Sequence, residues 1–355
     1  MRRKSIGDYL LLTLFSVGLV GALCASIDFA ASQNYLPALV GGRYVLVISF
    51  TALAVLFLSK SAHKLLRNHK KLKTIVFIIL CGLFVGTAIF LRCLVIQRIP
   101  IEPVEESLEN YTIGLSLLNG ETEQQYYALF PEKLGFPMLI LWPTFAIFGA
   151  SVRNALYANL VCSVISILLA GHIARRIAGR TGALVAVALM SLWPSHILFS
   201  NMVATEPSFT MLILLAADMM TSILDRRKGS LYDVAPSRML GVMALLGIVL
   251  AIAGAIRPMA VILLAAYCVA QLCVTGDPMN EIRVEGARYA TSQPIVCIVL
   301  VLVCYLVTGS VISRAISDII GEQPASGLYA SGYNLMVGLN TQSNGLWNET
   351  DSEFF

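Results

Sequence analysis

Apolar runs alternate with short polar segments along the chain, and many of these runs are close to the length that crosses a membrane. A spanning helix needs about 20 apolar residues. The runs predict nine spans, and the second of them is short: residues 9–31, 44–58, 74–96, 156–174, 182–199, 209–224, 240–256, 259–274 and 294–312. The predicted fold is therefore an all-α, polytopic transmembrane helical bundle.

One further apolar run, over residues 134–150, holds Pro137 and Pro143 and has two interpretations. If it crosses the membrane, one basic segment lies outside, against the tendency of Lys and Arg to stay on the cytoplasmic side. If it lies in the outer interface, three basic loops become cytoplasmic together: 60–73, 175–180 and 226–238. This consistency favours nine spans plus an outer-face interfacial helix, with the N-terminus cytoplasmic. Ten or more spans, with one loop that breaks the charge rule, is the alternative.

Composition agrees with a multi-pass protein of the plasma membrane. Of all residues, 57% are hydrophobic and 13% are charged, and the mean hydropathy is +0.77. Soluble domains keep about a quarter of their residues charged. The net charge of +4 reflects bases that set topology, so nucleic acid is not an expected partner. The eight cysteines lie in or beside apolar runs without a CxxC motif, and they indicate packing residues rather than disulfides or a zinc site.

The outer loop over residues 97–133 is acidic, with seven carboxylates and two bases between Arg98 and Lys133. Pro103 fits the first turn of a short helix and Gly120 fits its end. Such a helix would hold Glu105 and Glu106 beside the membrane, where a carboxylate could act as a general base. A solvated acidic loop that only follows the charge rule is the alternative.

Other polar residues are expected on the same outer side. His196 precedes Asn201 by about one helical turn, so both are expected to face one polar pocket, near Thr205 and Glu206. Helix capping by Thr205 and Glu206 before Pro207 is the alternative. Arg257 is a candidate for binding a lipid phosphate, or else an arginine whose head group reaches the interface. Asp218 is a further acid inside an apolar helix.

Three regions follow from this pattern. Residues 1–73 form an N-terminal extension with two spans and a basic cytoplasmic loop. Residues 74–314 form the main transmembrane module. Residues 315–355 form a polar outer tail, rich in Gly and Asn, which suits contacts with a sugar.

In their order and spacing these motifs resemble the GT-C superfamily of membrane glycosyltransferases. The closest likeness is the family-39 type, which includes protein O-mannosyltransferases and bacterial aminoarabinose transferases. Those enzymes carry an acidic residue after a proline in the first outer loop, before a short helix that ends in Gly. Pro103, Glu105, Glu106 and Gly120 are similar. Further similar features are Phe148-Gly149, Arg153, Ala174-Arg175-Arg176, Pro194, Thr205-Glu206-Pro207 and the tail from Gly338 to Asn348.

The sequence departs from the family at two points. The usual loop Asp is a Glu, and the two adjacent glutamates leave open which one is the base. The first two spans have no counterpart in the minimal family pattern.

The resemblance implies a glycosyltransferase that moves a sugar from a polyprenyl-phosphate donor to an acceptor protein, lipid or glycan on the extracytoplasmic face. Glu105 or Glu106 would deprotonate the acceptor hydroxyl or orient the donor, with inversion at the anomeric carbon. Glu206 would position a substrate, and Arg257 would hold the lipid phosphate. His196, Asn201 and Tyr111 are further candidates for substrate binding. No cofactor is certain, although a divalent cation is a candidate.

Two other classes use the same lipid-linked substrates. A transporter or flippase of lipid-linked glycans should place charged groups in the middle of the membrane. A polysaccharide polymerase or ligase should have a large outer loop rich in Arg and His. The acidic outer loop favours an enzyme of the transferase class over both.

Overall fold

The computed structural model describes residues 70–99, 102–120, 130–227, 236–273, 294–321, 336–337 and 339–340. Most of these residues are helical and none lies in a strand, which confirms the all-α class for this part of the chain. The chain divides into two compact units, 1–77 and 78–355, and only the second is considered below. The predicted spans 9–31 and 44–58 lie outside the described residues, as does most of the predicted tail.

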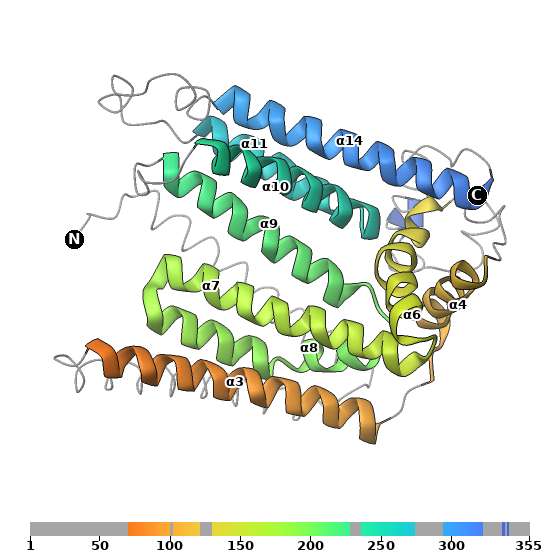
Figure 1. Ribbon diagram of the computed structural model, residues 1–355, viewed down its shortest axis with the longest axis horizontal. Helices are drawn as coiled ribbons and strands as arrows, with labels where there is room; N and C mark the ends of the chain where they lie inside the picture. Colours follow the sequence, from red (N-terminus) through yellow and green to blue (C-terminus); the bar gives the residue numbers. More distant parts are fainter. Residues whose placement is uncertain are drawn as a thin grey trace. The chain divides into compact units, whose positions relative to one another are not determined.

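Long helices run side by side in this unit (Figure 1). They are α3 (Lys70–Arg98), α7 (Val152–Leu192), α9 (Glu206–Arg227), α10 (Pro236–Ile256), α11 (Ala260–Cys273) and α14 (Pro294–Ile320). Helix α10 packs against α9, α11 and α14, and α7 packs against α9. Four described helices, α3, α7, α10 and α14, are long and apolar enough to cross a membrane.

Helix α7 is a hairpin rather than a single rod. Gly179 has φ 70° and ψ −162°, which is not a helical conformation. A Cβ at Gly171 would lie 2.5 Å from the side chain of Val187, although a straight helix would separate these residues by about 24 Å. The chain therefore reverses at Gly179, between the two predicted runs 156–174 and 182–199 (Figure 1).

Two short helical segments lie across one end of the long helices (Figure 1). The first is α4 (Glu105–Asn119), which ends at Gly120 with a left-handed φ of 73° and an N–H that donates to Ser116 O. The second runs through a 3₁₀ turn (Pro131–Leu134), a π turn (Pro137–Leu141) and α6 (Trp142–Phe148), and ends at Gly149 with φ 87°. Both glycines adopt backbone conformations that other residues rarely take, which explains why the helices stop there.

The predicted interfacial helix over 134–150 forms in pieces because of its prolines. Pro143 has no N–H, so it cannot continue the ladder of helical hydrogen bonds. The Trp142 N–H instead donates to Pro137 O across a π turn. The Thr144 hydroxyl donates to Ile140 O at 2.6 Å. The segment stays helical, but its type changes from turn to turn.

This segment has one buried and one exposed apolar side. Phe136, Leu141 and Phe145 are almost fully buried in the main hydrophobic core. The side chains of Trp142, Ile147 and Phe148 are exposed. The segment therefore presents an apolar surface away from the core, and its position in a membrane interface stays a prediction.

Two predicted runs differ most from the observed helices, each at its C-terminal end. The run 182–199 leaves helical geometry after Leu192, because Trp193 precedes Pro194 and is pushed to an extended conformation. The helix starting at Pro294 continues to Ile320 instead of ending at 312. Ile316 and Ile320 are buried against α4 and the 3₁₀ turn after it, and this packing stabilises two more helical turns.

The close approach of Gly135 to the end of α10 allows a test of this packing. A Cβ at Gly135 would lie 1.8 Å from the backbone oxygen of Ala255, near the end of α10. We expect Gly135→Ala to lower the free energy of unfolding by about 1–3 kcal/mol, because the two segments must separate. Thermal unfolding in detergent measures this. Gly82→Ala, where a Cβ would meet nothing within 4 Å, is the matched control. Equal melting temperatures for the two variants would contradict the contact.

Candidate functional site

The segment that joins α7 to α9 is held by side chains from several helices. It consists of α8 (Pro194–Leu198), the 3₁₀ turn Phe199–Asn201 and an extended stretch that ends at Glu206. The side chain of Asn159 on α7 is fully buried, and its Nδ2 donates to Met202 O at 2.7 Å and to Ala204 O at 3.2 Å. One amide thus fixes two peptide groups of the extended stretch.

Helix α4 holds the same stretch from another side. The Val203 N–H donates to Ser107 Oγ at 3.0 Å, and Asn110 Nδ2 donates to Val203 O at 3.4 Å. Both side chains of α4 are buried. Asn201 Nδ2 donates to Ile99 O, just beyond α3, at 2.6 Å. The N-terminal part of α4, where Glu105 and Glu106 lie, is therefore anchored to the backbone three residues before Glu206.

Glu206 and Arg257 form an ion pair, which joins two of the predicted site residues. Arg257 Nη2 lies 2.5 Å from Glu206 Oε1, and Arg257 Nε donates to Thr205 Oγ1 at 2.8 Å. About a third of each side chain is exposed. Glu206 also occupies the first turn of α9, where the helix dipole favours a negative charge. Glu206 therefore fits both predictions, because it stabilises the start of α9 and is also paired with a second candidate site residue.

Glu105 and Glu106 begin α4 and are exposed. Glu105 has φ 47°, a left-handed conformation that is unusual for a residue with a side chain. One turn later, Glu109 pairs with Lys133, whose Nζ lies 2.8 Å and 2.9 Å from the two carboxylate oxygens. Within the described residues, no hydrogen bond or ion pair joins Glu105 or Glu106 to Glu206 or Arg257. Their connection runs through Ser107 and the backbone of Val203.

Tyr111 lies on α4 with its ring against the core. Its ring centroid is 5.6 Å from that of Phe145, with an interplanar angle of 72°. Edge-to-face pairs of this kind stabilise packing. The ring therefore helps to fix α4 on α6, and a role in substrate binding stays a prediction.

His196 does not face the same pocket as Asn201, so that part of the prediction was wrong. Its Nδ1 lies 2.8 Å from Ser163 Oγ and 3.1 Å from Nη2 of Arg92. The short helix α8 starts at Pro194, and this new start turns His196 toward α3. Asn201 instead contacts the backbone beyond the end of α3.

Arg92 is the residue that the sequence analysis missed. It is fully buried, and its N–H groups point to Ser163 Oγ, Ala88 O, Ser191 O, Met190 O and His196 Nδ1. All of these acceptors are neutral. A usable signal was present, because an arginine inside the predicted span 74–96 is costly unless it is satisfied by the protein. Arg92 thereby joins α3 to both arms of the α7 hairpin and to α8.

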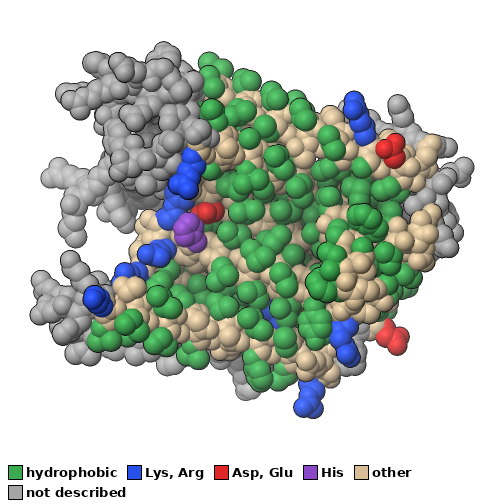
Figure 2. Space-filling view, viewed as in Figure 1, with side chains coloured by type: hydrophobic (Ala, Val, Ile, Leu, Met, Phe, Trp, Pro, Cys, Tyr) green, Lys and Arg blue, Asp and Glu red, His purple; other side chains and the backbone are tan. Residues whose placement is uncertain are grey.

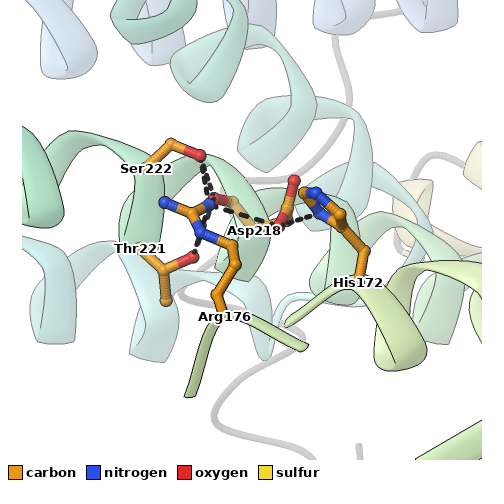
Figure 3. Close-up of polar contacts among 5 residues, drawn as sticks. All are labelled: His172, Arg176, Asp218, Thr221 and Ser222. Carbon is orange, nitrogen blue, oxygen red and sulfur yellow. Dashed lines mark hydrogen bonds and ion pairs between the residues drawn. The ribbon is translucent and has the colours of Figure 1, made fainter. Parts of the chain in front are cut away.

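A second polar cluster lies at the other end of α7 and α9, near the turn at Gly179 (Figure 3). Asp218 Oδ1 lies 2.8 Å from His172 Nδ1 and 3.4 Å from Arg176 Nη1. Arg176 also contacts Thr221 and Ser222 on α9. The predicted buried acid, Asp218, is thus partly buried and paired with a cation. This cluster lies far along the helices from Glu206 and belongs to a different site.

Among the described residues, no group of three or more His, Cys, Asp and Glu side chains could hold a metal ion. The seven described cysteines are free thiols.

Comparison with protein-family models, with curated proteins and with solved structures finds no match for this chain. The likeness to GT-C glycosyltransferases therefore rests on the sequence motifs alone and stays a prediction.

The environment of His196 predicts sensitivity to acid. Burial, and then the nearby charge of Arg92, lower the pKa of His196 from 6.5 to about 4. Between these values the unfolded chain binds a proton that the folded chain does not, so stability should fall as the pH falls from about 6.5 to about 4. Thermal unfolding across this range measures the effect. His196→Gln should flatten the dependence and His172→Gln should keep it, whereas identical profiles for the parent chain and His196→Gln would contradict this assignment.

Proposed function

We propose that this protein is a membrane glycosyltransferase that moves a sugar from a polyprenyl-phosphate donor to an acceptor on the extracytoplasmic face. One observation carries the proposal. The segment that leads to Glu206 and its partner Arg257 is hydrogen-bonded to α4, the helix that begins with Glu105 and Glu106. Several carboxylates and the Arg257 cation therefore lie at the same end of the apolar helices. A reaction on a lipid phosphate at a membrane surface requires such groups.

The proposed chemistry is a direct displacement. Glu105 or Glu106 accepts the proton of the acceptor hydroxyl, whose oxygen forms the new bond to the anomeric carbon. The bond from that carbon to the phosphate oxygen breaks, and the polyprenyl phosphate leaves with the electron pair. Arg257 stabilises the phosphate charge, since a guanidinium donates two parallel hydrogen bonds to such a group. Glu206 orients Arg257 through their ion pair.

Charge supports an orientation in which this end is extracytoplasmic. At the opposite end, Asp218 is paired with two α7 side chains, His172 and Arg176. Basic residues gather there, at 175, 176 and 180 beside the α7 turn and at 238 near the start of α10. In Figure 2, basic side chains and a histidine lie at the left of the coloured surface, and further basic side chains lie at its right, where acidic side chains also lie. Because Lys and Arg favour the cytoplasmic side, we propose about nine spans with the N-terminus cytoplasmic, in the plasma membrane.

Asp218 is the residue that would favour a transporter, because an ionisable residue among apolar helices often marks a transport pathway. However, Asp218 is paired with His172 and Arg176 at the end of the hairpin. Most acidic residues of the described part of the chain lie instead at the α4 end. This supports an enzyme whose active site lies at that end.

Substitution of the carboxylates tests the reaction. We expect Glu105→Gln or Glu106→Gln to lower sugar transfer at least about a hundredfold, because one of them is the general base. Glu206→Gln should also lower sugar transfer, because Arg257 loses the ion pair that orients it. Transfer from radiolabelled polyprenyl-phosphate sugars in membranes is the measurement. Asp318→Asn, an exposed carboxylate near the end of α14, is the matched control. Full activity in all three glutamine variants would rule out the proposed mechanism.

Cysteine labelling tests the orientation. In sealed, right-side-out vesicles, a membrane-impermeant maleimide should label Glu106→Cys above the background of the parent chain. His172→Cys, which replaces a side chain that is 55% exposed, should react only after permeabilisation. The reverse pattern would show that the proposed orientation is wrong.

A further inference from the structure

The turn of the α7 hairpin is a strongly basic surface at the end of the long helices opposite α4. Over residues 172–180 the chain has three arginines and one histidine and no acidic residue. Arg175 and Arg180 are exposed. Asp218 on α9 pairs with Arg176 and with the histidine (Figure 3). This one carboxylate offsets only one of the three guanidinium charges.

The length of the first arm of the hairpin places the turn at the level of lipid head groups. This arm runs from Val152 to the reversal at Gly179, and at about 1.5 Å per residue it is about 40 Å long. A bilayer measures about 40–45 Å across when both head-group layers are included. A helix of this length that starts in one head-group layer reaches the other, so its turn lies level with the lipid phosphates.

An exposed apolar side chain lies among the bases of the turn. Ile177 is 76% exposed, and it follows Arg176 and precedes Arg180 in the chain. At the boundary between head groups and acyl chains, an apolar side chain gains from contact with lipid while neighbouring guanidinium groups reach the phosphates. The combination of bases with Ile177 therefore fits a lipid surface better than bulk water.

Arginine is also the base that suits a phosphate group best, because its planar guanidinium can donate two parallel hydrogen bonds. Arg176 is directed toward α9 by its hydrogen bonds to that helix. Arg180 begins the second arm, directly after the break at Gly179, where the helix dipole disfavours a positive charge. An anion beside Arg180 would offset this unfavourable interaction.

We propose that Arg175 and Arg180 bind the phosphate of an anionic phospholipid, with Ile177 inserted beside the head group. The bound lipid would hold the turn of the hairpin at the membrane surface. A zwitterionic phospholipid carries a cation that offsets its own phosphate, so it should bind less tightly. The site lies at the other end of the helices from Glu206 and Arg257, and it does not depend on sugar transfer.

Native mass spectrometry of the full chain in detergent tests the site directly. Phosphatidylglycerol and phosphatidylcholine are titrated separately, and the apparent Kd of the first bound lipid is compared. We expect phosphatidylglycerol to bind at least about fivefold more tightly than phosphatidylcholine. The double variant Arg175→Gln with Arg180→Gln should weaken phosphatidylglycerol binding about tenfold to thirtyfold, because two bases near the anionic head group are lost.

A second variant and a matched control complete the test. Ile177→Asp places a negative charge on an exposed part of the turn and should also remove the preference for phosphatidylglycerol. The control is Arg153→Gln with Arg314→Gln, which removes the same charge from two exposed arginines near the α4 end. This control should keep the preference of the parent chain. Thermal unfolding of each variant confirms that it is folded, and Ile177→Asp decides the test if the double variant at the turn is not.

Three results would overturn the proposal. The first is equal affinity of the parent chain for the two lipids. The second is the same affinity for phosphatidylglycerol in the folded turn variants as in the control, which would show that the turn has no special part in binding. The third is displacement of phosphatidylglycerol by millimolar inorganic phosphate, which would assign the site to free phosphate instead of a lipid.

Discussion

The hydrogen bonds to the backbone between Asn201 and Thr205 are the constraint on which the rest of this end of the molecule depends. An extended stretch between two apolar helices exposes peptide groups that water cannot easily reach. Asn159 satisfies two of its carbonyls, and Ser107 and Asn110 satisfy both polar groups of Val203. Because these side chains come from α7 and α4, satisfying the backbone also fixes where α4 lies.

Two arginines of the described residues, one partly and one fully buried, are accommodated in different ways. Arg176 lies near a helix turn and shares a carboxylate, Asp218, with His172. Arg92 lies deep between α3 and the α7 hairpin, where neutral oxygens and the His196 ring satisfy its N–H groups. An ion pair tolerates partial exposure, whereas a lone buried cation needs an acceptor for each N–H. This need explains why α8 turns His196 toward α3.

Hydropathy and glycine positions predicted much of the fold, since apolar run length determines which segments become helices. Gly120 ends a short helix as expected, and Gly149 ends another. What a hydropathy pattern does not contain is the rotation of each helix about its axis. The direction of His196, the partners of Arg92 and the burial of Ile316 against α4 all depend on that rotation. The sequence predicted only that Glu206 and Arg257 lie on the same side of the membrane. It did not predict that they form an ion pair.

Geometry separates the roles of the carboxylates at this end. Oε1 of Glu206 already accepts from the guanidinium of Arg257, which suits it to position a cation rather than to take a proton from a substrate. Glu109 is likewise occupied by Lys133. Glu105 and Glu106 are exposed at the start of α4, and Glu105 holds a left-handed backbone that costs energy. Strain of this kind persists only where the surroundings over-determine it, and here the anchor is Ser107, two residues later, bound to Val203. The same contact that satisfies the buried backbone therefore also sets the position of Glu105.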